Sequence, residues 1–299
     1  MRLTTYHDAA SFLDIVRPEL AEREVEHHLL LGVAEAVAAA RAPNDSCFAA
    51  TVSDDGGLLV AAFMLHQRPL LIASDRSAAP AAFPLLRDAL ASTSHEPRHV
   101  IGPSGMIERG MQAWRRETER PARIAMHQRL YALESVAPIP ATGGHLRLAV
   151  DDDFDLVMRW TSAFEREALA HVAPQSTAAS VATRIAAGEI RLWCDPEPRT
   201  MAASARPTRR TIAVNGVYTP AEWRRFGYAT ACVAALSAAL LARGFERCVL
   251  YTDLSNPTSN AIYTRIGYHP VRDFLMYDLG DRPSHDSSPA EPEGRGLAS

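Results

Sequence analysis

The stretch at 137–144, Ala-Pro-Ile-Pro-Ala-Thr-Gly-Gly, interrupts this chain near its middle. Its prolines and glycines break helices and strands, and they follow an alternating apolar run at 124–133 that is typical of a strand. A chain of 299 residues is also long for one compact α/β unit and suits two units of roughly 140 residues. We therefore predict a domain at 1–136, a linker at 137–144 and a second domain at 145–280.

The two halves repeat one order of expected elements, although no sequence repeat is visible between them. Each begins with a strand and helical residues, continues with three strands, and ends with helix, strand, helix and strand. In the first half the expected strands are 2–6, 46–52, 58–65, 70–72, 99–101 and 124–133, and the helices are 19–40, 81–91 and 107–119. In the second half the strands are 145–150, 190–194, 200–205, 210–218, 248–252 and 268–277, and the helices are 152–170, 177–187, 228–243 and 258–266. This order predicts a tandem α/β protein.

The composition excludes several classes of protein. A net charge of -4 gives no basic surface for nucleic acid. The longest fully apolar run, 58–65, is far shorter than the roughly 18 residues that cross a bilayer, and the N-terminus lacks the apolar region of a signal peptide. We therefore predict a cytoplasmic protein with no membrane or nucleic-acid partner. Residues 281–299 are rich in Pro, Ser, Gly and Glu, so we expect a disordered tail there.

The types of residue present also limit the chemistry. All 31 basic residues are arginine, so no lysine amine can act as a base or form a Schiff base. The histidines show no paired spacing that favours a metal site, and His27 and His28 are expected to point to different faces of a helix. No metal is predicted. The four cysteines lack C-x-x-C spacing and are interpreted as small buried side chains: Cys47, Cys194, Cys232 and Cys248.

A strand, a tight turn and the start of a helix follow one another at 210–243. The turn reads Arg224-Arg-Phe-Gly-Tyr-Ala229, and its small residues at 227 and 229 let a ligand approach the backbone closely. The first turn of a helix exposes unpaired N–H groups and a partial positive charge, which suit a pyrophosphate. Pro220 ends the strand before the turn and is consistent with a strand that splays from its neighbour to leave a cleft. Alone, this pattern favours a structural turn over a binding site.

A second motif makes a binding site the better interpretation of this turn. The stretch Val217-Tyr-Thr-Pro-Ala-Glu-Trp-Arg-Arg-Phe-Gly-Tyr-Ala-Thr-Ala231 resembles motif A of the GNAT N-acetyltransferase superfamily. The stretch Asn256-Pro-Thr-Ser-Asn-Ala-Ile-Tyr263, followed by Arg265-Ile-Gly-Tyr268, resembles motif B of the same family. The resemblance covers about 145–279, with near-complete motif matches over 214–268. It implies tandem GNAT-like domains, each a mostly antiparallel mixed sheet flanked by helices, and acetyl-CoA as the acyl donor.

The resemblance also implies roles for particular residues. The backbone of Val217, Tyr218 and Thr219 would bind the pantetheine arm of CoA. Amide groups of the turn would hold the pyrophosphate, with added charge from an arginine; this turn comprises Arg224, Arg225, Phe226, Gly227, Tyr228, Ala229 and Thr230.

Motif B adds three more candidates. Asn256 and Asn260 fall where related enzymes place polar contacts to CoA, although Asn256 is equally suited to cap a helix. Tyr263 falls at the position whose hydroxyl protonates the departing thiolate. A phenol has a pKa of about 10 and carries its proton at neutral pH, as a general acid must.

The base that would take a proton from the acceptor amine is less well defined by the sequence. Glu165 and Glu167 lie on the expected helix 152–170, which borders the acceptor cleft in the family, so either is a candidate base or a clamp for the acceptor ammonium. His171 and Asp253 are alternatives.

The first half shows no such motif. The counterpart of the cofactor turn is expected at 99–110, which lacks the motif, so we expect a degenerate copy that completes the acceptor cleft or packs against the second domain. A separate module for a regulatory ligand is the alternative for this half. The sequence thus predicts an acetyl-CoA-dependent N-acetyltransferase acting on a small-molecule or peptide amine, as a monomer or a homodimer. A non-catalytic protein that binds or senses acyl-CoA is the alternative, and transfer to oxygen or use of a longer acyl chain stays open.

Overall fold

The computed structural model describes residues 1–40, 47–115, 121–168 and 176–280. The expected tail at 281–299 and the candidate base His171 lie outside these residues. None of the described helices combines the length and the apolar composition that crossing a membrane requires.

The described strands form one mixed sheet of 12 strands in the order β1-β2-β3-β4-β5-β12-β6-β11-β10-β9-β8-β7. Neighbours are antiparallel except for β4 with β5 and β10 with β11, which are parallel. The strands are β1 (Arg2–Tyr6), β2 (Cys47–Asp54), β3 (Gly57–Leu65), β4 (Leu70–Ala73), β5 (His99–Pro103), β6 (Arg123–Leu133), β7 (His145–Leu148), β8 (Ile190–Cys194), β9 (Pro198–Ala205), β10 (Thr211–Tyr218), β11 (Arg247–Asp253) and β12 (His269–Asp278).

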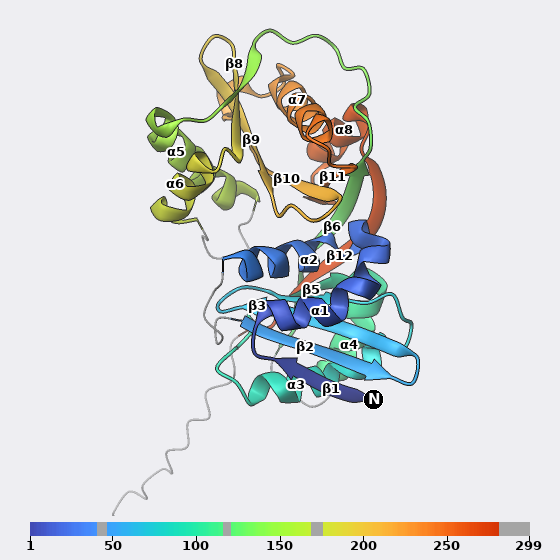
Figure 1. Cartoon of the computed structure of the whole chain (residues 1–299). Helices are drawn as coiled ribbons and strands as arrows, with labels where there is room; N and C mark the ends of the chain where they lie inside the picture. The colour runs from blue at the N-terminus through green and yellow to red at the C-terminus, as the bar shows by residue number, and fades with distance from the viewer. Residues whose placement is uncertain (41–46, 116–120, 169–175, 281–299) are drawn as a thin grey trace, which may run out of the picture.

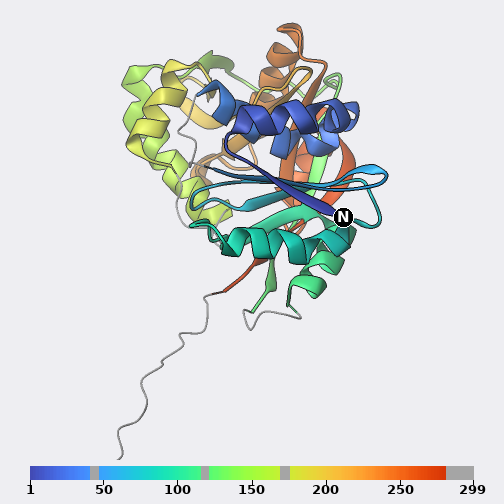
Figure 2. The same cartoon turned by 60° about the horizontal axis from the view of Figure 1, so that its bottom comes forward.

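Helices cover both faces of this sheet (Figures 1 and 2). In the first half, α1 and α2 cover one face and α3 and α4 the other, because alternate residues of β2 and β3 belong to two separate cores. In the second half, α7 and α8 pack on one face and α5 and α6 on the other. The helices are α1 (Ala9–Leu20), α2 (Glu24–Ala39), α3 (Phe83–Ala91), α4 (Ser104–Arg115), α5 (Phe154–Ala168), α6 (Ala178–Ala186), α7 (Tyr228–Ala242) and α8 (Pro257–Ile266).

Apart from α1, the predicted order of elements is confirmed, and it is the same in both halves: strand, two helices, three strands, helix, strand, helix, strand. The fold class, a mostly antiparallel mixed sheet flanked by helices, is also confirmed. The four cysteines are buried and free, as the sequence indicated.

One expected helix was wrong at its start. The expected helix at 19–40 combines the last turn of α1 with α2, and α1 itself was missed. Asp8 begins α1 by accepting a hydrogen bond from the Ser11 amide, and the apolar stripe of α1 packs into the core. The backbone of Arg23 (φ -120°, ψ 54°) breaks the helical path before α2. Charged residues span this break, so the sequence pattern does not reveal it.

The last strand of each half enters the sheet of the other half (Figure 1). Strand β12 pairs with β5 of the first half, and β6 pairs with β11 of the second half. The exchanged strands also pair with each other over most of their length. An ion pair between Arg129 Nε and Asp273 Oδ1, 2.6 Å apart, bridges them. The two halves are therefore joined by a continuous hydrogen-bonded sheet as well as by the segment at 137–144, whose role as a domain linker stays a prediction.

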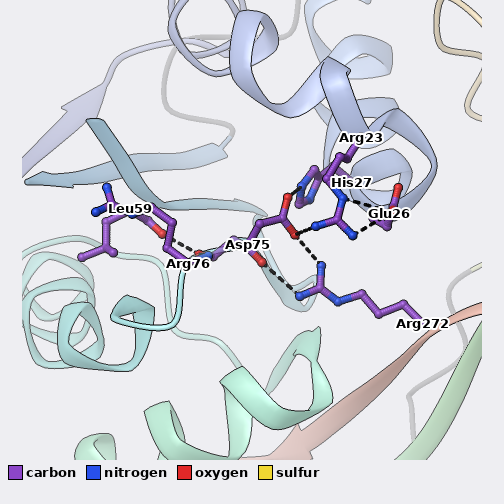
Figure 3. A network of polar contacts seen from close by, with 8 residues as sticks. Arg23, Glu26, His27, Leu59, Asp75, Arg76 and Arg272 are labelled. Carbon is purple, nitrogen blue, oxygen red and sulfur yellow. Dashed lines mark hydrogen bonds and ion pairs between the residues drawn. The ribbon is translucent and has the colours of Figure 1, made fainter. Parts of the chain in front are cut away.

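A carboxylate at the junction of the two halves collects three cationic or polar partners (Figure 3). Asp75, directly after β4, accepts a hydrogen bond from His27 Nε2 of α2 at 2.7 Å and one from Arg272 Nη1 of β12 at 2.7 Å. Arg23 Nη1 lies 3.1 Å from the same carboxylate. The hydrogen bond from His27, followed by the hydrogen bond from Arg272 and the charge of Arg23, holds the pKa of Asp75 well below its usual value. Asp75 thus ties α2 to the exchanged strand.

We predict that Asp75→Asn lowers the free energy of unfolding by about 2 kcal/mol at neutral pH, because it removes the charge that three partners share. A folded-state pKa below the unfolded value of about 3.9 means that the stabilisation is present above that pH and is lost as pH falls through the folded value. The difference between the two proteins in denaturant titrations should therefore begin to shrink below about pH 4 and disappear only when the pH reaches the much lower folded-state pKa. Asp88→Asn is the control: its carboxylate is 65% exposed beside Arg87, and the change should stay within about 0.5 kcal/mol. Equal effects of the two substitutions would contradict a central role for Asp75.

Candidate functional site

Strands β10 and β11 start side by side and then part. They pair only from Thr211 with Arg247 to Ala213 with Val249, although β10 continues to Tyr218 and β11 to Asp253. A bulge between Asn215 and Tyr218 changes the register of β10 against β9, and Gly216 adopts a φ of 58° within it. The sequence predicted a splayed strand from Pro220, but the divergence begins before that residue. The edge of β10 that faces the gap is left without a partner strand, so an extended ligand can hydrogen-bond to it.

The turn between β10 and α7 leaves the start of α7 open. Gly227 precedes the helix with a φ of 88°, a conformation that favours glycine, and no side chain caps the first turn. The amide groups at the start of α7 therefore have no side-chain acceptor among the described residues. A Cβ atom on Gly227 would lie 3.0 Å from Oγ1 of Thr142, so the segment at 137–144 passes beside this turn.

Arg224 and Glu167 bring the turn and α5 together. Arg224 Nη2 lies 2.6 Å from Glu167 Oε2, and Arg224 Nε donates to the carbonyl of Thr219 at 2.9 Å. The hydroxyl of Tyr218 donates to Glu167 Oε1 at 3.2 Å. Burial, followed by the charge of Glu167, raises the pKa of Tyr218. The structure thus brings together four candidate residues from two separate parts of the sequence: Glu167, Tyr218, Thr219 and Arg224.

Arg225 and Phe226 remain on the surface of the turn. Arg225 is exposed with a φ of 69° and forms no ion pair with the described residues, so its charge is available to a ligand. The ring of Phe226 is 60% exposed and lies between Trp223 and Tyr228. Tyr228 itself is tied down, because its hydroxyl donates to Asp195 Oδ2 at 2.8 Å.

The two asparagines of motif B form structural hydrogen bonds. Asn256 caps α8, since its side chain accepts from the amide of Ser259 at 3.0 Å. Asn260 Nδ2 donates to the carbonyls of Asp253 and Asn256 at 3.0 and 2.7 Å. Asn260 Oδ1 accepts from the hydroxyl of Tyr131 on β6 at 2.9 Å. The amide of Asn260 therefore joins α8 to β11 and to the exchanged strand, while its predicted contact with CoA stays a prediction.

Tyr263 lies on α8 against the core beneath α7. Its side chain is 9% exposed, and its ring meets that of Tyr268 edge to face with centroids 6.0 Å apart. The hydroxyl has no hydrogen-bond partner among the described residues. Burial raises the pKa of Tyr263 to about 12. The phenol therefore keeps its proton at any physiological pH and is free to donate it.

The two candidate bases have different surroundings. Glu165 is buried, and its Oε1 accepts from both the amide and the hydroxyl of Ser176, at 3.0 and 2.8 Å. Glu167 is about half exposed beside Tyr218. Asp253 accepts from the amide of Ser255 at 2.8 Å and shapes the turn after β11.

Sequence reasoning missed one residue near the gap. The hydroxyl of Thr200 on β9 donates to the carbonyl of Tyr218 at 2.7 Å and lies 2.8 Å from the hydroxyl of Thr219. It fixes the end of the strand that is expected to hold pantetheine. Burial is continuous from Thr200 to Ser204 of β9, so no alternation marks Thr200, and the partner of β9 had to be known to place it.

The comparison of the halves also requires a correction. The counterpart of β10, its turn and α7 is β4, residues 74–82 and α3, because β4 and β5 are the parallel pair of the first half. The segment at 99–110, which we compared with the cofactor turn, instead corresponds to β11 and the start of α8. The true counterpart, 74–82, contains no glycine and carries Asp75, the carboxylate at the junction.

Comparisons with known proteins agree with these features. Residues 161–268 match the sequence profile of the Acetyltransferase (GNAT) family. No curated protein sequence matches the chain. A Drosophila protein of known structure has a TM-score of 0.67 and 14% identity, covering 93% of this chain and 98% of that one. A GCN5-related N-acetyltransferase from Sphaerobacter thermophilus has a TM-score of 0.59 and 15% identity, with 92% and 94% coverage. An acetyltransferase of the GNAT family from Colwellia psychrerythraea has a TM-score of 0.57 and 10% identity, with 93% and 100% coverage. At these identities the structures establish the shared fold.

We predict that Asn260→Ala lowers the free energy of unfolding by about 2 kcal/mol, because it leaves the Tyr131 hydroxyl without its acceptor and removes one of the two hydrogen bonds that the carbonyls of Asp253 and Asn256 each accept. Tyr131→Phe should cost less, about 1 kcal/mol, and a double-mutant cycle in urea should show coupling between the two positions. Asn256→Ala, which removes only a cap, should cost about 1 kcal/mol. If Asn260→Ala instead leaves stability unchanged and weakens acetyl-CoA binding, a direct CoA contact is the better explanation.

Proposed function

We propose that this protein, whose residues 161–268 match the Acetyltransferase (GNAT) family, transfers an acetyl group from acetyl-CoA to a primary amine. The observation that carries this proposal is the gap between β10 and β11, which opens directly beside the uncapped start of α7. A thioester whose carrier lies along β10 and whose pyrophosphate meets α7 has its acyl group held at that gap.

The groups proposed to bind acetyl-CoA are mainly backbone amides and carbonyls rather than side chains. The unpaired edge of β10 at Val217, Tyr218 and Thr219 offers amides and carbonyls to pantetheine. The amides from Gly227 to Thr230 offer donors to the pyrophosphate. Arg225 is the available cation of the turn, because Arg224 is paired with Glu167.

Tyr263 is the proposed general acid. The amine nitrogen attacks the thioester carbonyl carbon, the C–S bond breaks, and the phenolic proton passes to the leaving sulfur. A general acid must carry a proton and must be free to donate it to the leaving sulfur. The Tyr263 hydroxyl is protonated and has no hydrogen-bond partner among the described residues. The proton that the amine loses then restores the phenol by way of solvent.

Glu167 is the better placed of the two proposed carboxylates for the acceptor. An alkylammonium with a pKa near 10 must lose a proton before attack, and a carboxylate beside the gap can hold the ammonium or receive that proton through water. Glu167 contacts Tyr218 at the edge of the gap, whereas the Glu165 oxygen is bound by Ser176. In this assignment Glu165 holds the chain that follows α5.

The acceptor is proposed to enter from the face opposite the donor. Helices α7 and α8, with the cofactor turn and Tyr263, lie on one face of β10 and β11. The other face carries α5 and α6, and Val25 of α2 packs there against Ala213 and Val249. The first half therefore contributes α2 as part of the acceptor side. The cytoplasmic location and the oligomeric state stay predictions.

We predict saturable binding of acetyl-CoA by the wild-type protein in isothermal titration calorimetry. Gly227→Ala should weaken it about tenfold or more, because a side chain at a φ of 88° displaces amides that are worth about 1.5–3 kcal/mol toward an anion. Gly244→Ala is the matched control: Gly244 follows the other end of α7 with a φ of 104° and open space around it. It should lose similar stability, about 1 kcal/mol, and keep its affinity for acetyl-CoA. Absence of binding to the wild type would refute the proposed function.

We predict that Tyr263→Phe lowers kcat for acetyl transfer about 100-fold or more, with acetyl-CoA affinity unchanged, because it removes only the proton donor. The measurement is CoA release with a panel of amino acids, polyamines, aminoglycosides and peptide N-termini. An unchanged rate for an acetylated amine would exclude Tyr263 as the acid. Binding of acetyl-CoA without turnover of any amine would favour the alternative function, acyl-CoA sensing.

A further inference from the structure

One half-buried guanidinium on the acceptor face forms no ion pair with the part of the chain that the structure describes. Around α2 and the neighbouring edge of the second half, other arginines are paired: Arg23 and Arg272 with Asp75, Arg210 with Glu24, and Arg184 with Glu189. Arg206, in the connection from β9 to β10, donates no hydrogen bond and forms no ion pair with any described residue. Arg206 is therefore the exception among the partly buried arginines around α2, since the others each form an ion pair.

The fold directs Arg206 to this position. Its backbone adopts a φ of 51°, which is unfavourable for a residue other than glycine, and its carbonyl accepts a hydrogen bond from His28 Nε2 of α2 at 2.8 Å. A Cβ on Gly32 of α2 would lie only 2.8 Å from the Cβ of Arg206. A glycine in the helix therefore makes room for this side chain between α2 and the sheet.

The side chain of Arg206 is half-buried and has no partner among the described residues. Its Nε atom is buried without an acceptor, and burial lowers the pKa of Arg206, while the charge of Glu189 acts in the opposite direction without forming an ion pair with it. The hydroxyl of Tyr251 on β11 is likewise buried without a partner, and burial raises the pKa of Tyr251, so the phenol is neutral and can donate a hydrogen bond. Arg206 and Tyr251 lie near enough for each to influence the pKa of the other, and a guanidinium without an ion-pair partner has donors left for an anion. A planar cation beside a hydroxyl suits a carboxylate.

This group of residues lies next to the reaction gap. Tyr251 is two residues past Val249, where β11 stops pairing with β10, and its side chain packs with Val249 and Ala213 on the α2 face. Asn215, two residues past Ala213 on β10, accepts a hydrogen bond from Arg184 Nη2 at 3.2 Å. Two residues of a strand span about 7 Å, so a carboxylate at Arg206 and an amine at the gap fit within one small molecule.

We propose that Arg206 and Tyr251 bind the carboxylate of the acceptor, so that the amine acetylated by this protein belongs to an amino acid or a similar amino carboxylate. This inference rests on the proposed acetyl transfer and names its acceptor class.

Matched acceptors test the proposal. CoA release is measured with amino carboxylates of increasing length, from glycine to 6-aminohexanoate, and with the corresponding amides, which lack the carboxylate charge; rates are compared at equal concentrations of neutral amine, because the amide also lowers the pKa of a nearby amine. For at least one length, kcat/KM should favour the carboxylate about tenfold or more, as expected when one charge-assisted contact is lost. Equal rates for acids and amides at every length would overturn the proposal.

Arg206→Gln should abolish this preference by raising KM for the carboxylates, while rates with amides and affinity for acetyl-CoA stay unchanged. The backbone carbonyl that His28 uses is retained in the variant. Arg209→Gln is the control, because Arg209 is an exposed arginine of the same connection, and it should keep the preference. A preference that survives in Arg206→Gln would overturn the proposal.

Two further measurements do not depend on turnover. In the presence of CoA, calorimetry should detect binding of an N-acetylated amino carboxylate more strongly than of its amide, and Arg206→Gln should remove the difference. Failure of every N-acetylated carboxylate to bind at millimolar concentration would overturn the proposal, whereas acetyl-CoA binding would still support the proposed function. The melting temperature of Arg206→Gln should be unchanged, because the substitution breaks no ion pair or side-chain hydrogen bond with the described residues; a fall of several degrees would indicate a structural role instead.

Discussion

The pairing of β6 with β12 is the interaction on which the rest of this structure depends. Each strand is the last of its half, and each completes the sheet of the other half before pairing with its counterpart. Because backbone groups in a sheet must find partners, neither half can withdraw without exposing the hydrogen-bonding edge of its neighbour. The carboxylate of Asp75 reinforces this junction by binding α2 and β12 at once.

The exchange also positions the candidate site. The hydroxyl of Tyr131, on β6, holds the amide of Asn260 and so fixes the start of α8 that carries Tyr263. The second half thus depends on a strand of the first half to orient its proposed acid. Helix α2 packs across the same junction and covers part of the opposite face of β10 and β11. The first half, which lacks a glycine in the turn equivalent to the cofactor turn, serves the site through packing and strand pairing.

Local sequence patterns predicted much of the second half. The alternation of β10, the glycine and alanine of the turn, and the spacing to Tyr263 are signals carried by neighbouring residues, and each of them reappears in the structure. The break between α1 and α2 was missed because charged residues continue through it. The choice between a cap and a ligand for Asn256 depended on hydrogen bonds of about 3 Å that no spacing specifies.

By itself the sequence determined the order of elements, apart from α1, and the place of the two GNAT-like motifs, because helix and strand periods and turn residues act within a few positions of the chain. Only the tertiary structure decided that β6 and β12 change places, since an alternating strand is compatible with several neighbours and the final choice depends on contacts far apart in sequence. The same holds for Arg206. The sequence shows that residue 206 is an arginine. That its side chain lies near the gap without an ion-pair partner among the described residues becomes clear only when α2, β9 and β11 come together.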